Sequence, residues 1–210
     1  QFYEMFVLKP EHARAHREGD IHIHDMDFLT LTTTCCQIDI EKLFKGGFST
    51  GHGFLREPND IQSYAALACI AIQSNQNDQH GGQSIPDFDY GMANGVKKTY
   101  RKLYWTNLGK MLNLLFDIED GVEKVKAIGA EIMEKHDIYP ILADDNNYKT
   151  IEREYLSEII DEKYIDKLQK KSTKYANEEI RRATYQAMEA FVHNLNTMHS
   201  RAGAQIPFSS

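Results

Sequence analysis

The chain has 210 residues, of which 41% are hydrophobic, and its formal net charge is -7. This length and composition suffice for one medium domain or two small ones with a genuine core. The acidic balance argues against a general nucleic-acid binder, whose phosphate contacts need clustered Lys and Arg. It still permits a mononucleotide held by a few cations.

The sequence also argues against a membrane protein or a secreted disulfide scaffold. It has no apolar run of roughly 20 residues and no signal-peptide pattern. Three cysteines, two of them adjacent, do not make a disulfide framework, so we expect a reducing cytoplasm. The chain begins at Gln1 without Met and stops within a strand-like "AQIPFSS", so we expect a fragment of a longer polypeptide.

The first quarter of the chain predicts one helix, two extended segments and a loop. Residues 8–20 predict a helix with Pro10 in its first turn and Gly19 as its stop. Residues 21–28 alternate, with His22, His24, Met26 and Phe28 on one face. Residues 29–40 are rich in β-branched residues and predict a second extended segment. The glycine-punctuated residues 44–59 predict a loop.

The rest of the chain is mainly helical. Asn59 and Gln62 resemble a capping box that opens a helix over 60–79, apolar nearly all round in its first half and therefore buried. Residues 87–136 predict helix interrupted near 117–121, and 137–148 predict a loop. Helices are then expected over 150–172 and 176–200, followed by a strand. The fold class is therefore α/β, predominantly helical with a few strands near the ends.

A metal site is weighed first and set aside. His22, His24 and Asp25 have the chemistry to bind zinc or iron. An H-x-H pair alone is a weak signal, and neither H-E-x-x-H nor paired C-x-x-C is present. We therefore expect no metal in this chain and interpret these histidines as exposed or hydrogen-bonded.

The adjacent cysteines point to opposite faces if this segment is a strand. Cys36 then shares a face with isoleucines, which indicates packing. Cys35 shares the polar face with Gln37 and Asp39, and a thiol on such a face can line a cavity. Cys35 is therefore the functional candidate, although a buried structural thiol is the simpler alternative. Cys69, in the apolar helix half, is expected in the core.

Two further patterns have structural interpretations that we rank first. The loops "GGQS" and "GGFSTGHG" have glycines suited to anion binding, but they match no phosphate-binding motif, so tight turns are favoured. The amides Gln73, Gln76 and Gln79, with His80, follow one helix flank. Base recognition suits such amides, but a polar interface between helices is the simpler interpretation.

Five motifs in order add up to a family resemblance: "AHREGDIHIHDMDF", "TTTCCQID", "GGFSTGHGFLREPNDI", "AIQSNQNDQHGGQSIPDFD" and "VHNLNTMHSRAGAQIPFSS". Together they resemble the catalytic region of anaerobic (class III) ribonucleoside-triphosphate reductases, over nearly the whole chain. The resemblance implies that residues 1–210 are the N-terminal portion of a ten-stranded α/β barrel. The implied activity is anaerobic reduction of ribonucleoside triphosphates for DNA precursor synthesis, in a homodimeric glycyl-radical enzyme.

The resemblance also implies cofactors and partners of the full enzyme. These are a glycyl radical made by an iron–sulfur activase with S-adenosylmethionine, zinc, ATP and dNTP effectors, and formate or a thioredoxin-like protein as electron donor. The family's thiyl cysteine, zinc-binding cysteine pairs, glycyl-radical loop and ATP-cone have no counterpart in these 210 residues. We therefore expect no bound cofactor and no turnover by this chain alone.

Individual residues carry over by position. Cys35 matches the first-strand cysteine that resembles a proton donor and reductant in loss of the 2′-hydroxyl. Thr34 stands where several relatives have a substrate-contacting Asn, and His22 matches a histidine near the pocket. Glu57 and Lys102 match positions that contact the deoxynucleotide effector at the dimer interface. Lys102 is accompanied by a basic patch of Lys97, Lys98 and Arg101, although ordinary surface charges remain an alternative.

Two other functions stay open at this point. One is a helical dimerisation or nucleotide-sensing module without chemistry of its own. The other is a different glycyl-radical enzyme, such as a lyase acting on a small organic acid. Cysteine pairs and a glycyl-radical loop in a longer polypeptide would favour the reductase.

Overall fold

The computed structural model describes residues 2–23, 35–51, 53–79, 81–142, 146–197 and 208–209. These residues are mostly helical. The helices are α1 (Phe2–Phe6), α2 (Pro10–Glu18), α3 (Ile40–Phe44), α4 (Ile61–Asp78), α5 (Phe88–Phe116), α6 (Gly121–His136), α7 (Asn146–Ser157) and α8 (Glu162–Thr197). The strands are β1 (Cys36–Gln37), β2 (Phe48–Ser49), β3 (Phe54–Leu55), β4 (Gln83–Ser84) and β5 (Phe208–Ser209).

The strands form two small sheets. β4 lies between β1 and β5 and is parallel to both, with Cys36 opposite Gln83. β2 and β3 form an antiparallel hairpin. The prediction of a mainly helical chain with a few strands is thus confirmed. A closed barrel is not seen among the described residues, and the barrel stays a prediction.

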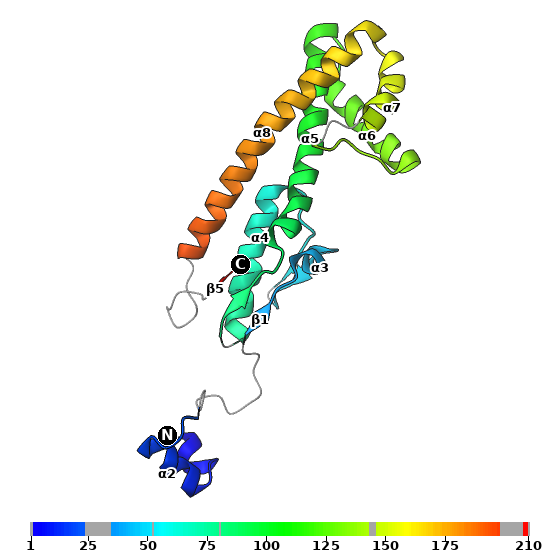
Figure 1. Cartoon of the computed structure of the whole chain (residues 1–210). Coiled ribbons are helices and arrows are strands. Elements are labelled where there is room, and N and C mark those ends of the chain that lie inside the picture. The colour runs from blue at the N-terminus through cyan, green and yellow to red at the C-terminus, as the bar shows by residue number, and fades with distance from the viewer. Residues whose placement is uncertain are drawn as a thin grey trace.

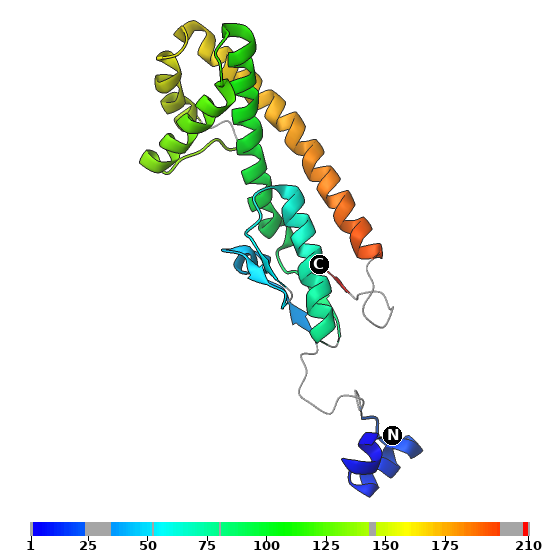
Figure 2. The ribbon, with the colours of Figure 1, turned by 180° about the vertical axis from the view of Figure 1, so that it is seen from behind.

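Two long helices organise the molecule. α5 and α8 run side by side, and α4 packs against both of them near the sheet (Figure 1). The same arrangement is seen from behind, with the helix pair α1 and α2 apart from the other helices in both views (Figure 2). At 1.5 Å per residue, the 36 residues of α8 extend about 54 Å, long enough to join two separate hydrophobic cores.

The first of these cores, the base core, surrounds α4. Ile61, Ala68 and Ile72 of α4 are fully buried against α3, the start of α5 and the end of α8. The expected burial of this apolar half is confirmed. So is the core position of Cys69, which is 2% exposed, and this burial raises the pKa of its thiol to about 11.

The second core, the apical core, fills the space between α5, α6, α7 and α8. It contains a buried polar network around Glu152, whose carboxylate accepts hydrogen bonds from the Tyr104 hydroxyl at 2.6 Å and from Gln169 Nε2 at 2.9 Å. The Ser172 hydroxyl donates to the Tyr104 carbonyl oxygen at 2.6 Å. Burial is the largest cause that raises the pKa of Glu152 above its ordinary value.

Several predicted boundaries are wrong, and each has a local cause. Asp60, not Asn59, caps α4: its carboxylate accepts from the Ser63 backbone N–H at 2.8 Å, whereas Asn59 Oδ1 accepts from Lys102. The predicted 44–59 loop contains the β2–β3 hairpin, because Gly51 and Gly53 adopt positive φ between the two short strands.

The last two helices divide at a different point from the one predicted. α8 continues through 173–175, and α7 ends at Ser157 instead. The Ser172 hydroxyl donates to a carbonyl oxygen of α5 and the Thr173 hydroxyl to one of the preceding turn of α8, so neither caps a helix. Asp161 is the residue that caps, since its carboxylate accepts from the Lys163 backbone N–H at 3.1 Å. By contrast, the helix predicted over 8–20 is confirmed, with Gly19 left-handed at φ 83° as its C-cap.

Candidate functional site

The small parallel sheet has one face covered by α4. Cys36 and Gln83 lie opposite each other in the register, so their side chains share a face. Both contact Asn75 of α4: Asn75 Nδ2 donates to Cys36 Sγ at 2.9 Å and to Gln83 Oε1 at 2.8 Å. The face that carries Cys36 is therefore the face that packs on the helix.

An amide network fixes this packing. Gln83 is 2% exposed and donates through Nε2 to the Ile72 carbonyl oxygen at 3.0 Å and to Gln76 Oε1 at 2.9 Å. Gln76 thus lies in a polar interface, but its partner is a residue of β4, so the prediction of an interface between helices is wrong for this residue. Gln79 is also buried, and its Nε2 donates to the Gly81 carbonyl oxygen. Gln73 is exposed.

Cys35 precedes β1 and is exposed. Within β1, alternation places the exposed Gln37 on the face opposite Cys36, and an extended chain through Cys35 is expected to put its side chain on that opposite face too. Cys36 is half-buried and lines a cleft of about 730 Å³ with Asn75 and Ser74 of α4 and Lys42 of α3. The expectation that Cys36 only packs among isoleucines is therefore incomplete, since a polar amide holds its sulfur.

Of the other two predicted substrate residues, His22 is described and Thr34 is not. Thr34 lies outside the described residues, as do His24 and Asp25. His22 follows α2, with its ring 5.7 Å from that of His16. Among the described residues, no group of three or more His, Cys, Asp and Glu side chains is arranged to hold a metal ion. In this described part of the chain, no helix combines the length and apolarity needed to cross a membrane.

Glu57 and Lys102 lie where the chain entering α4 crosses α5. Glu57 accepts from Lys98 Nζ at 2.6 Å and from the Gly46 backbone N–H at 3.0 Å. These bonds, the Lys98 ammonium first, lower the pKa of Glu57. Lys102 Nζ donates to Asn59 Oδ1 at 3.1 Å. The two predicted residues thus share one region, and Lys98 is the neighbour that links it together.

The expected basic patch does not form as a single surface. Lys98 is paired with Glu57, and it shares a helix flank with Lys102 four residues later. Arg101 faces another direction and stacks on the Tyr139 ring at 3.1 Å. Proximity in sequence therefore overstated the local positive charge, because Lys98 is neutralised by a carboxylate and Arg101 is stacked on a ring.

Comparisons with known proteins give one consistent result. A family model described as anaerobic ribonucleoside-triphosphate reductase matches residues 1–210. The anaerobic ribonucleoside-triphosphate reductase of Enterobacteria phage T4 is 30% identical over 99 residues, which are 46% of this chain and 16% of the phage protein. Those of Salmonella typhimurium and Escherichia coli are each 29% identical over 98 residues, 46% of this chain and 14% of each relative. The aligned part is thus a small share of each relative's length.

Proposed function

Because the chain belongs to the anaerobic ribonucleoside-triphosphate reductase family, we propose that residues 1–210 form the N-terminal part of a catalytic barrel. That barrel reduces ribonucleoside triphosphates to 2′-deoxyribonucleoside triphosphates. The observation that carries the proposal is that α4 covers the sheet face of Cys36 while the preceding residue, Cys35, is exposed, so we take the opposite face as the open one. Cys36 is held on the α4 side, so Cys35 is left on the side where a barrel interior would lie.

Cys35 acts on the substrate from this open face. The family's glycyl and thiyl radicals, placed elsewhere in the polypeptide, supply removal of the 3′ hydrogen. Cys35 donates its thiol proton to the 2′ oxygen as the C2′–O bond breaks, so that water leaves. The two electrons and the hydrogen that C2′ gains pass through this sulfur from an external donor, formate or a thioredoxin-like protein, which is oxidised, and the 3′ hydrogen is then returned. A thiol suits both roles because it can release a proton and then a reducing equivalent without a metal.

Thr34 and His22 belong to the same proposal as substrate-binding residues. Thr34 precedes Cys35 directly, so it lies within one residue of the reacting thiol. His22 follows α2, and its imidazole lies near that of His16 in the last turn of this helix. Imidazoles can donate to phosphate or ribose oxygens.

Glu57 and Lys102 form a site for a deoxynucleotide effector. Lys102 binds phosphate oxygens, and Glu57 accepts hydrogen bonds from a base or sugar. Support comes from their position at the α4–α5 crossing, where Lys98 and Asn59 add a second cation and an amide. A bound effector would replace the Lys98–Glu57 and Lys102–Asn59 bonds. Its binding would therefore change how the segment before α4 is held against α5.

The partners of the proposed enzyme are a second copy of the chain and an iron–sulfur activase that uses S-adenosylmethionine. The proposed reductase functions in the cytoplasm, and neither a nucleic acid nor a membrane is among its partners. Zinc and the radical residue belong to other parts of the polypeptide, and no step proposed for Cys35 passes through zinc. The helical sensing module is not favoured by any observation, and the family match over all 210 residues favours the reductase.

The test uses the complete enzyme and two adjacent cysteines as a matched pair. Cys35→Ala should abolish deoxynucleotide formation and leave glycyl-radical generation, measured by electron paramagnetic resonance, intact. Cys36→Ala should retain turnover and lose roughly 1–2 kcal/mol of stability, because its thiol only packs and accepts from Asn75. If Cys36→Ala abolished turnover and Cys35→Ala did not, the assignment of the two faces would be reversed.

A further inference from the structure

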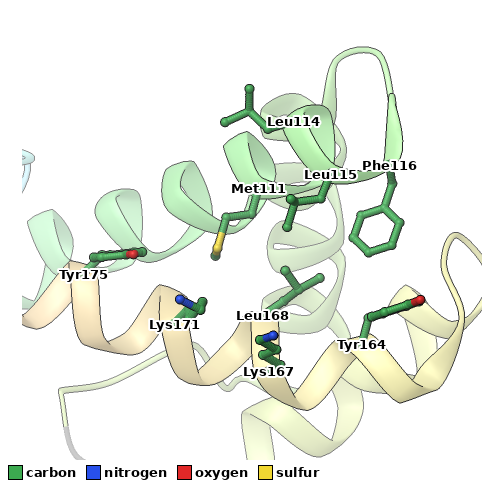
Figure 3. Close-up of a pocket in the computed structure, with 9 residues that line it drawn as sticks. All are labelled: Met111, Leu114, Leu115, Phe116, Tyr164, Lys167, Leu168, Lys171 and Tyr175. Atoms are coloured by element: carbon green, nitrogen blue, oxygen red, sulfur yellow. The ribbon is translucent and has the colours of Figure 1, made fainter.

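The C-terminal end of α5 and the N-terminal part of α8 enclose a groove with a cavity volume of about 650 Å³, here named the α5–α8 groove (Figure 3). Met111, Leu115 and Phe116 of α5 face Leu168 of α8 across it. Leu168 is 3% exposed and forms the floor, shared with the apical core. This volume lies within the roughly 300–1,000 Å³ that ligand sites occupy.

The rim of the groove is unusually apolar for a surface. Leu114 is 82% exposed and Leu115 63% exposed, although the apical core beneath them is closed without either side chain. Single exposed leucines are ordinary, but a pair contiguous with an apolar hollow is typical of a contact surface. The apical core therefore does not explain the exposure of these two leucines.

The groove is also basic in an acidic chain. Lys167 and Lys171 line it, and no carboxylate does. Neither ammonium forms an ion pair within the described part of the chain. The only acid among residues 163–174, Asp166, is paired with Arg153 at 2.6 Å. The lysine stems can cover apolar surface and leave their charges available to an occupant.

The length of the groove fits about three turns of helix. Tyr164 and Tyr175 line its two ends, and the eleven intervening steps at 1.5 Å per residue cover about 16 Å. Phe116 closes the Tyr164 end, where the two rings meet edge to face at 5.3 Å. A straight apolar trough of this length suits the i, i+3 or i+4, i+7 side chains of an amphipathic helix.

A second copy of this chain is a poor occupant by charge. Two such grooves facing across a two-fold axis would bring the same lysines together, since an isologous interface pairs a surface with itself. Like charges brought together in this way oppose association. Complementarity requires acids beside the apolar anchors of the occupant.

We propose that the α5–α8 groove binds an amphipathic helix of an acidic partner protein. Leucine-sized side chains of that helix fill the hollow over Leu168, and its flanking carboxylates pair with Lys167 and Lys171. The site is separate from Cys35 and from the α4–α5 crossing, so its test does not depend on the proposed reductase activity.

The experiment measures binding of fluorescein-labelled helical peptides to the 210-residue chain by anisotropy. The first peptide has leucines at i, i+3, i+7 and i+10 flanked by glutamates, and the second has lysines in place of the glutamates. The acidic peptide should bind about tenfold more tightly, and this preference should shrink as salt is raised. Lys167→Glu/Lys171→Glu should reverse the preference. Leu114→Asp/Leu115→Asp should abolish binding of both peptides.

Matched controls make the result decisive. Lys97→Glu/Lys124→Glu changes the net charge equally at exposed sites outside the groove and should keep the acidic preference. A scrambled acidic peptide with no apolar face should not bind. The proposal is overturned if both peptides bind the unmodified chain equally. It is also overturned if Lys97→Glu/Lys124→Glu reverses the preference as strongly as Lys167→Glu/Lys171→Glu. It is also overturned if sedimentation shows self-association that Leu114→Asp/Leu115→Asp abolishes, because a second copy then covers the groove.

Discussion

Glu152 shows how one residue can make stability depend on pH. The carboxyl is fully buried, and burial raises its pKa above the ordinary value of 4.5. The folded chain therefore keeps a proton that the unfolded chain releases. The contribution of this carboxyl to the free energy of unfolding is fully present below about pH 4.5. It falls as pH rises toward the raised pKa, by at most about 1.4 kcal/mol per pH unit.

Glu152→Gln should remove this dependence, because an amide keeps the hydrogen bonds from Tyr104 and Gln169 and has no proton to lose. Urea unfolding followed by circular dichroism at several values between about pH 5 and pH 8 measures it. The unmodified chain should lose stability over this range more steeply than the Glu152→Gln variant. Glu154→Gln, at an exposed position of the same helix, is the control. An unchanged pH slope in the Glu152→Gln variant would show that another group is responsible.

The packing of α5 against α6 depends on the absence of a side chain at Gly129. A Cβ atom there would lie 2.4 Å from Trp105 Cε2, and the indole is held by a hydrogen bond from Nε1 to the Tyr148 hydroxyl at 2.9 Å. Gly109 permits a similar approach near the start of α6, where its Cβ would lie 2.3 Å from Val122 Cα. The close contact between these helices therefore depends on glycines, Gly121 at the start of α6 among them.

Gly129→Ala should destabilise the chain by roughly 1–3 kcal/mol. Alanine favours helix by about 1 kcal/mol over glycine, but the clash with a ring that cannot rotate away outweighs that gain. Chemical unfolding measures the difference, with Lys124→Ala in the same helix as a control expected within about 0.5 kcal/mol of the original. Stabilisation by Gly129→Ala would mean that α6 moves freely relative to α5.

At the scale of the whole molecule, the proposed effector site joins two elements that fold against the base core. Lys102→Ala in the complete enzyme should weaken dGTP and dTTP binding by roughly 1–3 kcal/mol, the cost of a lost charged hydrogen bond. It should also reduce discrimination between substrates and leave basal turnover intact. Calorimetry and product analysis measure both effects, and Lys97→Ala is the control. Unchanged affinity and substrate choice would place the effector elsewhere.

The sequence alone determined the elements that depend on local chemistry. Gly19 ends α2 because a left-handed residue is needed there, and the apolar half of α4 was predictable because every face of it is apolar. The separate α5 and α6 were predictable because the Asp- and Gly-rich residues 117–121 oppose helix. The order of the five family motifs identified the family. These signals are short in range, so no tertiary contact is needed to detect them.

Tertiary structure alone decided which distant residues meet. No local rule links Asn75 to Cys36, Glu152 to Tyr104, or Glu57 to Lys98, because each pair joins separate elements. The same cause made Ser172 an internal helix residue, since its hydroxyl binds a carbonyl oxygen of α5. It also divided Lys98 from Arg101, which face different neighbours. The sequence determines which residues share a helix face, but the group that this face contacts is fixed only when the whole chain packs.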